Sequence, residues 1–327
     1  MRCLMFACGL AASGLCKKTR GIVKQGIALS VLSSGLFAAL YYYSTVLHPL
    51  SGSEIFAWRV ILALPVLAIL ISRERSWKEI AGAVRRLRRE WPLFLASAAL
   101  IGVQLWLFMW APLHQRGLDV SLGYFLLPLS MVVVGRFFYD ERLSRVQWLA
   151  VGVAAMGVAH EFVRAGSFSW ATALVMCGYP PYFMLRRAMR LRSLAGLWFD
   201  MLLLAPIALL ILLSQSPGLL PQFADRPSLL GLVPLLGVMS SAALIGYLSA
   251  SRLLPLSLFG IMGYVEPVLL FWVAFLFLGE NMTASAWWTY LPIWLAVLLM
   301  AGEGLWLWNK EARGRAGSVS TRESGRR

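Results

Sequence analysis

Residues 128–148 read PLSMVVVGRFFYDERLSRVQW, and residues 267–287 read PVLLFWVAFLFLGENMTASAW. Each stretch places a proline thirteen residues before a glutamate, which is followed by an apolar residue, a serine or threonine, and a tryptophan. The second stretch follows the first at a constant offset of 139 residues. Because both lie in a long apolar chain, we interpret them as corresponding parts of a duplicated membrane unit. Such a duplication is more typical of a transporter than of an enzyme.

The composition is that of a membrane protein. Hydrophobic residues make up 59% of the chain and its mean hydropathy is +0.72, whereas soluble proteins are usually about 45–50% apolar. The net charge is +15, but the basic residues lie in short loops between apolar segments, which argues against a nucleic-acid partner. The four cysteines form no CxxC pair, so the sequence predicts neither a metal site nor a cofactor.

Apolar segments of about 20 residues are long enough to cross a bilayer as helices. The sequence predicts an all-α integral membrane protein with ten transmembrane helices. They are expected at residues 25–47, 54–72, 92–112, 119–139, 145–162, 169–186, 195–214, 228–251, 255–278 and 284–307.

The distribution of lysine and arginine predicts the orientation. With a cytoplasmic N-terminus, 26 of the 30 basic residues fall on the cytoplasmic side, three fall outside, and Arg59 lies within a helix. Cytoplasmic loops are enriched in these residues, so both termini are predicted to be cytoplasmic. Residues 1–23 would form an N-terminal tail and residues 309–327 a disordered basic tail.

The two halves correspond beyond the opening motif. The sequence SAALIG occurs at residues 97–102 and again at 241–246. We therefore divide the chain into a first repeat, residues 24–166, and a second repeat, residues 167–308. Since each repeat holds five helices, an odd number, the second must be inverted relative to the first. Inverted repeats offer two similar ways of packing, one open to each side of the membrane.

Two glutamates and a serine mark the starts of predicted helices. Ser144 is expected to cap the fifth helix, with Gln147 completing a capping box. Glu141 and Glu280 directly precede the fifth and tenth helices, where a carboxylate would face a positive helix start. A substrate role is the alternative for both acids.

These features are accompanied by residues that resemble the RarD family, which belongs to the EamA group of the drug/metabolite transporter superfamily. The resemblance covers residues 24–307 and implies inverted five-helix repeats in the bacterial inner membrane that move small organic solutes. Gln104 and Leu127 stand where we expect asparagine in the family, which implies a pocket of different polarity. The residues that carry the resemblance are Tyr42-Tyr43-Ser44, Pro49-Leu50-Ser51, Glu54-Ile55-Phe56, Arg59, Ser121-Leu122-Gly123-Tyr124-Phe125, Pro128, Gly135, Asp140-Glu141-Arg142-Leu143 and Glu266-Pro267.

Glu266 is the first candidate for substrate binding or proton coupling. It lies about twelve residues, or about 18 Å, into the ninth helix, near the midplane of a core about 30 Å thick. A charge at that depth costs about 2.5–3.5 kcal/mol, so its presence requires a reason. Pairing with a buried donor at a packing kink is the alternative, and Asp200 is the second candidate for coupling.

Prolines at corresponding positions predict helix breaks at the site. Pro267 leaves the carbonyl of Gly263 without its usual partner, and Pro128 does the same to Tyr124. Each kink has a tyrosine close by, Tyr124 in the fourth helix and Tyr264 in the ninth. Exposed backbone acceptors near the membrane centre are typical of transporter sites.

Arg59 and Asp200 carry opposite charges at corresponding positions of the two repeats. They enter the membrane from opposite sides, each by about 9 Å, which leaves about 12 Å of depth between them. We therefore expect them in opposite vestibules, Arg59 paired with Glu54 or Glu161 and Asp200 paired with Arg252.

Aromatic residues suggest the chemistry of the solute. Trp106 and Trp110 are four residues apart and share a helix face. With Tyr124 and Tyr264 they could line an apolar cavity, and an acid beside aromatic rings suits an organic cation. Interfacial tryptophans are the alternative.

The sequence therefore predicts a secondary transporter, working by alternating access on small organic solutes such as amino acids, metabolites or drugs, with proton coupling at a buried acid. A flippase-like mover of an amphipathic lipid-linked molecule is the alternative. An enzyme is not expected, because the chain has neither a Walker A loop nor a compact set of nucleophile, base or metal ligands. The small residues of the fifth helix, among them Gly157, would allow close packing within the monomer or in a homodimer.

Overall fold

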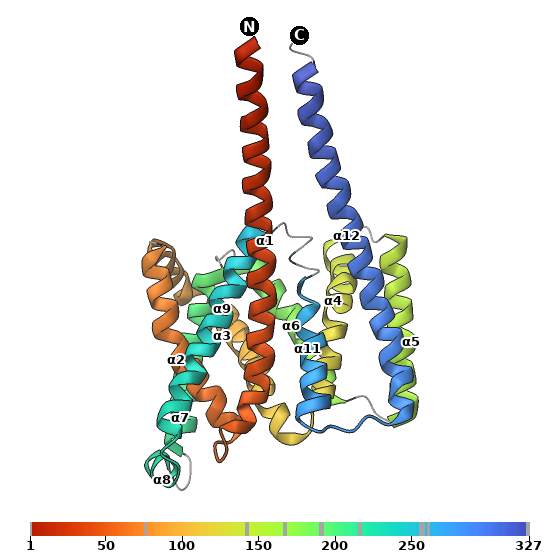
Figure 1. Ribbon diagram of the computed structural model, residues 1–327. Coiled ribbons are helices and arrows are strands. Elements are labelled where there is room, and N and C mark those ends of the chain that lie inside the picture. The colour runs from red at the N-terminus through yellow and green to blue at the C-terminus, as the bar shows by residue number, and fades with distance from the viewer. Residues whose placement is uncertain are drawn as a thin grey trace.

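The computed structural model describes residues 2–74, 77–140, 144–165, 169–189, 193–214, 218–254, 259 and 262–324. These residues form a bundle of helices without a strand, and both ends of the chain project from the same end of the bundle (Figure 1). Glu141 lies outside the described residues.

The helices follow one another with short connections. The long ones are α1 (Arg2–Val46), α2 (Gly52–Arg73), α3 (Trp77–Trp110), α4 (Gly117–Tyr139), α5 (Arg145–Ala165), α6 (Trp170–Met189), α7 (Ser193–Ser214), α9 (Leu229–Leu253) and α12 (Trp287–Ser324). The short ones are α8 (Leu219–Asp225), α11 (Val265–Trp272), the π-helix η2 (Val273–Phe277) and the 3₁₀ turns η1 (Ala111–His114) and η3 (Ala284–Ala286).

Within the described residues, eight helices are long and apolar enough to cross a membrane. The predicted all-α membrane class is thereby confirmed, but the count of ten is not. The residues of the sixth predicted span form α6, which is not among these eight helices and has Arg186 and Arg187 in its last turn. The ninth is represented by the shorter apolar stretch Val265–Phe277.

The helices pack around two apolar cores. The first core is formed mainly by α1, α2, α3, α6, α7 and α9. The second core is formed by α4, α5, α11 and α12 and includes Phe125, Ala154, Phe271 and Ile293. Each core draws helices from both predicted repeats, so residues 24–166 and 167–308 interleave in space. Many side chains that face outward are themselves apolar, as expected for a lipid-facing surface.

Two local features were predicted correctly. The capping box at α5 is confirmed, with reciprocal bonds of 3.0 Å between the backbone N–H and side-chain oxygen of Ser144 and Gln147. The small-residue face of α5 packs within the chain, because a Cβ added at Gly157 would collide with the carbonyl of Thr289 in α12.

Helix continuity differs at the two prolines that were expected to break helices. The helix α4 continues through Pro128, since proline is tolerated in membrane helices where neighbouring groups satisfy the backbone. Beside the other expected break, a turn at Gly263–Tyr264 lies immediately before α11, which contains Pro267. Residues 309–324, expected to belong to a disordered tail, continue α12 in the structure.

Candidate functional site

Arg59 of α2 contacts residues of α1, α3 and α9. Its Nε donates a hydrogen bond of 2.8 Å to Ser240 Oγ of α9. Its guanidinium carbon lies 5.3 Å from the ring centre of Phe108 and 5.9 Å from that of Phe37. Its Nη1 is buried and has no hydrogen-bond partner within the described part of the chain. The cation is therefore only partly satisfied by the protein.

Glu266 opens α11 and lies within electrostatic range of Arg59. Both residues lie deep in the protein and yet keep some accessible surface. No hydrogen bond or ion pair of 4.0 Å or less joins Glu266 to Arg59, or to any other residue that the structure describes. Glu266 therefore interacts with Arg59 only at a distance, and no described group neutralises the acid by direct contact.

Two tyrosines complete this region. The Tyr124 and Tyr179 hydroxyls are hydrogen-bonded at 2.9 Å, and both lie within electrostatic range of Arg59 and Glu266. Tyr124 also packs edge-on against Phe108, with ring centres 6.3 Å apart. We call Arg59, Tyr124, Tyr179 and Glu266 the central group. It combines α2, α4, α6 and α11, and so joins helices of both cores.

Sequence reasoning missed Tyr179. The signal was the run Tyr179-Pro180-Pro181-Tyr182, in which two prolines within a membrane helix are flanked by two tyrosines. Prolines in such a helix survive where neighbouring groups restore the polar contacts, so polar neighbours could have been expected.

The partners predicted for Arg59 were wrong. Glu54 caps its own helix by accepting a 2.7 Å bond from the Ser51 N–H, and its other oxygen accepts a 2.9 Å bond from Gln222 Nε2. Glu161 accepts a 2.7 Å bond from Thr289 Oγ1. Both acids are held by nearby polar groups, while Arg59 turns inward.

Asp200 of α7 is almost completely buried and well partnered. It accepts a 2.8 Å bond from Ser97 Oγ and a 3.2 Å bond from the Tyr182 hydroxyl, and Arg186 lies in electrostatic range. The predicted pairing with Arg252 was wrong, because Arg252 forms an ion pair of 2.5 Å with Glu74. Asp200 therefore joins α3, α6 and α7 within the first core.

The remaining candidates are not brought into the central group. Gln104 donates a 2.7 Å bond to the Leu174 carbonyl. Trp110 stacks on Trp106 at 5.5 Å and on His114 at 3.9 Å, at the end of α3. Tyr264 packs in the second core. The predicted aromatic cavity of Trp110, Tyr124 and Tyr264 is therefore not formed in this structure.

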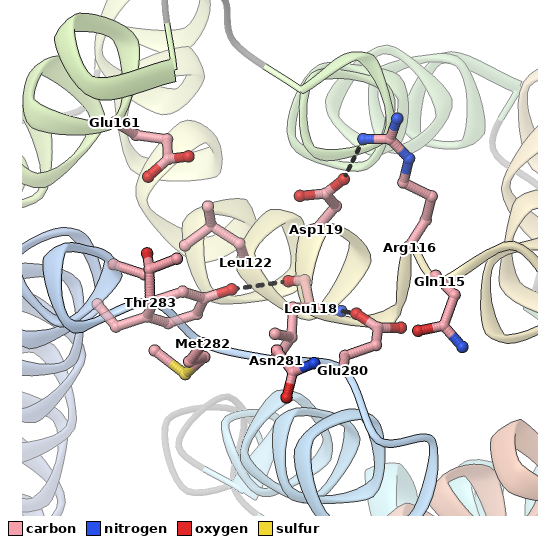
Figure 2. Close-up of a pocket in the computed structure, with 12 residues that line it drawn as sticks. Gln115, Arg116, Leu118, Asp119, Leu122, Glu161, Glu280, Asn281, Met282 and Thr283 are labelled. Atoms are coloured by element: carbon pink, nitrogen blue, oxygen red, sulfur yellow. Dashed lines mark hydrogen bonds and ion pairs between the residues drawn. The ribbon is translucent and has the colours of Figure 1, made fainter.

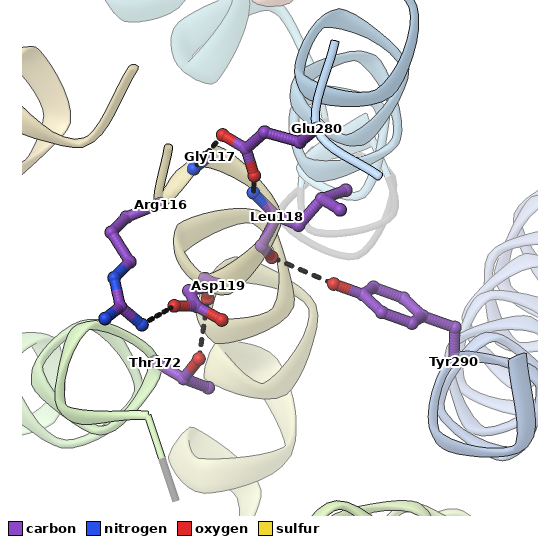
Figure 3. A network of polar contacts seen from close by, with 7 residues as sticks. All are labelled: Arg116, Gly117, Leu118, Asp119, Thr172, Glu280 and Tyr290. Carbon is purple, nitrogen blue, oxygen red and sulfur yellow. Dashed lines mark hydrogen bonds and ion pairs between the residues drawn. The ribbon is translucent and has the colours of Figure 1, made fainter. Parts of the chain in front are cut away.

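A cavity of about 270 Å³ lies elsewhere, where α4 begins and α12 approaches it (Figure 2). The Glu280 carboxylate accepts bonds of 2.5 Å and 2.8 Å from the N–H groups of Gly117 and Leu118 (Figure 3). Glu280 thus faces a positive helix start, as predicted, but the helix is α4 and not the tenth span. Burial raises the pKa of Glu280, and the two backbone bonds oppose this shift.

The other polar groups around this cavity also hold α4 in place. Asp119 pairs with Arg116 at 3.0 Å, and the Asp119 carbonyl accepts a 2.7 Å bond from Thr172 Oγ1. Tyr290 donates a 3.1 Å bond to the Leu118 carbonyl (Figure 3). We interpret this cavity as a structural junction. No cluster of three or more potential metal ligands occurs among the described residues.

Comparisons with known proteins identify the relatives of this chain. No family model matches. The chain is 46% identical over 295 residues to the chloramphenicol-sensitive protein RarD of Pseudomonas aeruginosa, an alignment that covers 88% of this chain and 97% of that protein. It is 38% identical over 288 residues to a Haemophilus influenzae protein named an uncharacterized transporter, covering 87% and 96%. It is 27% identical over 284 residues to protein RarD of Escherichia coli, covering 86% and 96%. With this identity along almost the whole length of its relatives, the chain belongs to the RarD family.

Proposed function

We propose that this protein is a secondary transporter that moves small organic solutes across the bacterial inner membrane. The observation that carries the proposal is the central group, in which the oppositely charged residues Arg59 and Glu266 interact without a direct contact. Ionisable residues within membrane-spanning segments are rare and typically mark a substrate or ion pathway. The relatives named as transporters support the same class of function.

Two repeats in inverted arrangement account for the packing pattern. In the two repeats, α2 corresponds to α7 and α9 corresponds to α3. The contact between α2 and α9 therefore corresponds to the contact between α7 and α3. Both pairs are joined by a serine that holds a charged residue: Ser240 holds Arg59, and Ser97 holds Asp200.

Helix ends give a further matched pair of contacts. Arg187 of α6 lies 4.3 Å from the Tyr139 ring centre at the end of α4. The counterparts of α6 and α4 in the other repeat are α1 and the ninth span. Between these two, the Tyr42 ring packs edge-on against the Phe277 ring, with ring centres 5.8 Å apart. These correspondences support ten helices in two inverted repeats, and the distribution of lysine and arginine supports cytoplasmic termini.

Alternating access then takes the form of movement between the two cores. The central group lies where helices of the first core, α2 and α6, meet helices of the second, α4 and α11. Rotation of the second core against the first would open this region to one side and then to the other. The turn at Gly263–Tyr264 and the π-helix η2 on either side of α11 are suitable places for the necessary adjustment.

Glu266 is the proposed coupling residue. It can exchange a proton for substrate because it lies deep in the protein and accepts no hydrogen bond from a described residue. Asp200 is less suited to this role, since Ser97 and Tyr182 already bind its carboxylate.

Transport by the purified protein tests the proposal. Liposomes containing the full chain would be loaded with a defined mixture of amino acids, organic cations, organic acids and amphenicols. Counterflow of each labelled solute would then be measured with wild type, Glu266→Gln and the exposed-site control Asp225→Asn. We expect saturable counterflow of one class, retained by the control and lost in Glu266→Gln. Its absence for every class in well-folded protein would contradict the proposal and favour a lipid-linked substrate.

A further inference from the structure

We propose that a groove between α5 and α12 binds a phospholipid whose headgroup carries a primary ammonium group, with an acyl chain in the groove and the ammonium on Glu303. This site is separate from the central group, so the inference does not depend on which solute the protein moves. It gives a role to a carboxylate that the proposed transport mechanism does not use.

The groove lies on the surface of the helix pair α5 and α12, which pack side by side at one edge of the bundle (Figure 1). Its volume is about 470 Å³, within the range of about 300–1,000 Å³ that is usual for ligand sites. Leu298 and Trp306 are 67% and 60% exposed, so the groove is open to the acyl chains of a surrounding membrane. It is lined by one acid among apolar residues and a glycine: Val146, Leu298, Leu299, Gly302, Glu303 and Trp306.

The packing of the two helices leaves space at this end of the pair. At Gly157 of α5 an added Cβ would lie 2.7 Å from the Thr289 carbonyl oxygen of α12, so the helices are in close contact there. From that contact they separate towards the start of α5 (Figure 1). A Cβ added at Gly302, in the groove, would meet no atom within 4 Å. An apolar chain can therefore lie against α12 at this point without displacing a side chain.

Glu303 lies at the level where acyl chains meet headgroups. The apolar stretch of α12 that can cross a membrane ends at Trp306, three residues or about 4.5 Å beyond Glu303. The corresponding stretch of α5 begins at Arg145, next to Val146 of the groove. Tryptophan at the end of a membrane helix is typical of this boundary. A lipid whose chain occupies the groove therefore brings its headgroup to Glu303.

The charge of Glu303 selects the headgroup. The residue is half-buried and forms no hydrogen bond or ion pair with another residue that the structure describes. A carboxylate beside apolar side chains is costly unless a partner is bound. A primary ammonium offers a positive charge and three N–H donors. The trimethylammonium of choline has no N–H to donate, and an anionic headgroup would be repelled.

A cation beside the groove suits the other half of the same headgroup. Arg145 is exposed at the start of α5, within one residue of the lining residue Val146. A guanidinium binds a phosphate well. The acid and the base together favour a headgroup that carries a phosphate and a primary ammonium.

Native mass spectrometry of the full chain, delipidated in detergent, tests this inference. The probes are phosphatidylethanolamine, phosphatidylcholine and phosphatidylglycerol, all with dioleoyl chains. Wild type should bind phosphatidylethanolamine saturably and about fivefold more tightly than either other lipid, the upper range for a partly exposed ion pair. Glu303→Gln should bind phosphatidylethanolamine and phosphatidylcholine equally, and Glu303→Lys should prefer phosphatidylglycerol.

A second pair of variants tests the groove itself. Gly302→Leu places a side chain in the groove without striking the protein, and it should weaken the binding of phosphatidylethanolamine about fivefold or more. Gly231→Leu in α9 is the matched control, because this glycine is also exposed and an added Cβ there meets no atom within 4 Å. It should bind lipid as wild type does. Thermal unfolding of each variant checks that the fold is kept.

Three results would overturn the inference. Equal binding of the three lipids by wild type, or an unchanged preference in Glu303→Gln, would remove the role of the acid. Unsaturable binding, or binding that Gly302→Leu leaves intact, would show that the lipid lies elsewhere. A lipid-free dimer that dissociates in Gly302→Leu would assign the groove to a second copy of the chain.

Discussion

Asp200 and Arg59 occupy corresponding places in the two predicted repeats, and their surroundings in the structure differ. Each is a charged residue held by a serine from a neighbouring helix, Ser97 for Asp200 and Ser240 for Arg59. Asp200 has a second partner in Tyr182 and is almost fully buried. Arg59 has one hydrogen bond, a buried Nη1 without an acceptor in the described residues, and an acid nearby that it does not touch.

We infer that this difference separates a structural charge from a functional one. A buried charge with several hydrogen bonds stabilises the arrangement of the helices around it. A buried charge with fewer partners costs stability, and its presence favours a role in function. In the proposed pair of repeats, Asp200 would then stabilise the fold and Arg59 would take part in binding.

Removing the structural charge should have the largest effect on stability. Asp200→Ala leaves the Ser97 and Tyr182 hydroxyls without their acceptor and removes a negative charge that attracts Arg186. We expect a loss of about 3–5 kcal/mol in the free energy of unfolding, as for other broken buried networks. Denaturant unfolding in detergent, with Asp225→Ala as an exposed control, would measure it. A loss equal to that of the control would show that Asp200 does not stabilise the fold.

The second-largest loss of stability is expected for a substitution at the junction where α4 begins. Glu280→Ala removes the acceptor of the Gly117 and Leu118 N–H groups, both at the start of α4. The expected cost is about 1–3 kcal/mol, from donors left without an acceptor. The preference among transported solutes should stay unchanged, because this junction is separate from the central group. Altered selectivity in this variant would place the substrate path through the cavity.

Ser97 and Ser241 occupy the same place in the two copies of SAALIG. Their alanine variants should differ by about 1 kcal/mol in the free energy of unfolding. Ser97→Ala removes a hydrogen bond to Asp200, which typically costs about 0.5–1.5 kcal/mol. Its counterpart Ser241 is also buried, but its hydroxyl has no partner within the described residues. Ser241→Ala should therefore be neutral or slightly stabilising. An equal loss of stability in Ser97→Ala and Ser241→Ala would show that the two hydroxyls do not differ in their contribution to stability.

The pH dependence at Glu280 should be smaller and has a definite sign. Because burial raises its pKa, the stability that Glu280 contributes is complete below the pKa of an unfolded glutamate and declines as pH rises through the raised value. Wild type should thus gain thermal stability relative to Glu280→Gln on going from pH 7 to pH 4. A relative loss over the same interval would contradict the direction of this shift.

The functional charge should have the smallest effect on stability. Arg59→Met replaces a partly satisfied cation with an apolar side chain of similar length, which is often neutral or stabilising. We expect the free energy of unfolding to stay within about 1 kcal/mol of wild type. A destabilisation as large as that of Asp200→Ala would assign Arg59 to the framework.

The sequence was sufficient for the features that depend on local spacing. Hydropathy located most of the helices, the 139-residue offset predicted a duplication, and Ser144 with Gln147 marked the start of α5. The sequence also identified Arg59, Asp200 and Glu266 as candidates, because a charged residue within an apolar stretch can be recognised without a structure.

Side-chain partners could not be predicted in the same way. They depend on how each helix is rotated and on which helices from distant parts of the chain become neighbours. Ser240 is 181 residues from Arg59, and Ser97 is 103 residues from Asp200. Glu54 and Arg252, the expected partners, were already engaged by Ser51 and Glu74. The behaviour of Pro128 likewise depends on packing that the sequence does not display.

Counterflow and thermal unfolding of Arg59→Gln and Asp200→Asn, measured side by side on the same preparations, test the central claim most directly. The account predicts that Arg59→Gln unfolds close to wild type and loses counterflow of the solute found for wild type, at least tenfold. It predicts that Asp200→Asn unfolds earlier, while the folded protein keeps the wild-type preference among the screened solutes. The opposite assignment, with selectivity lost in Asp200→Asn and kept in Arg59→Gln, would contradict it.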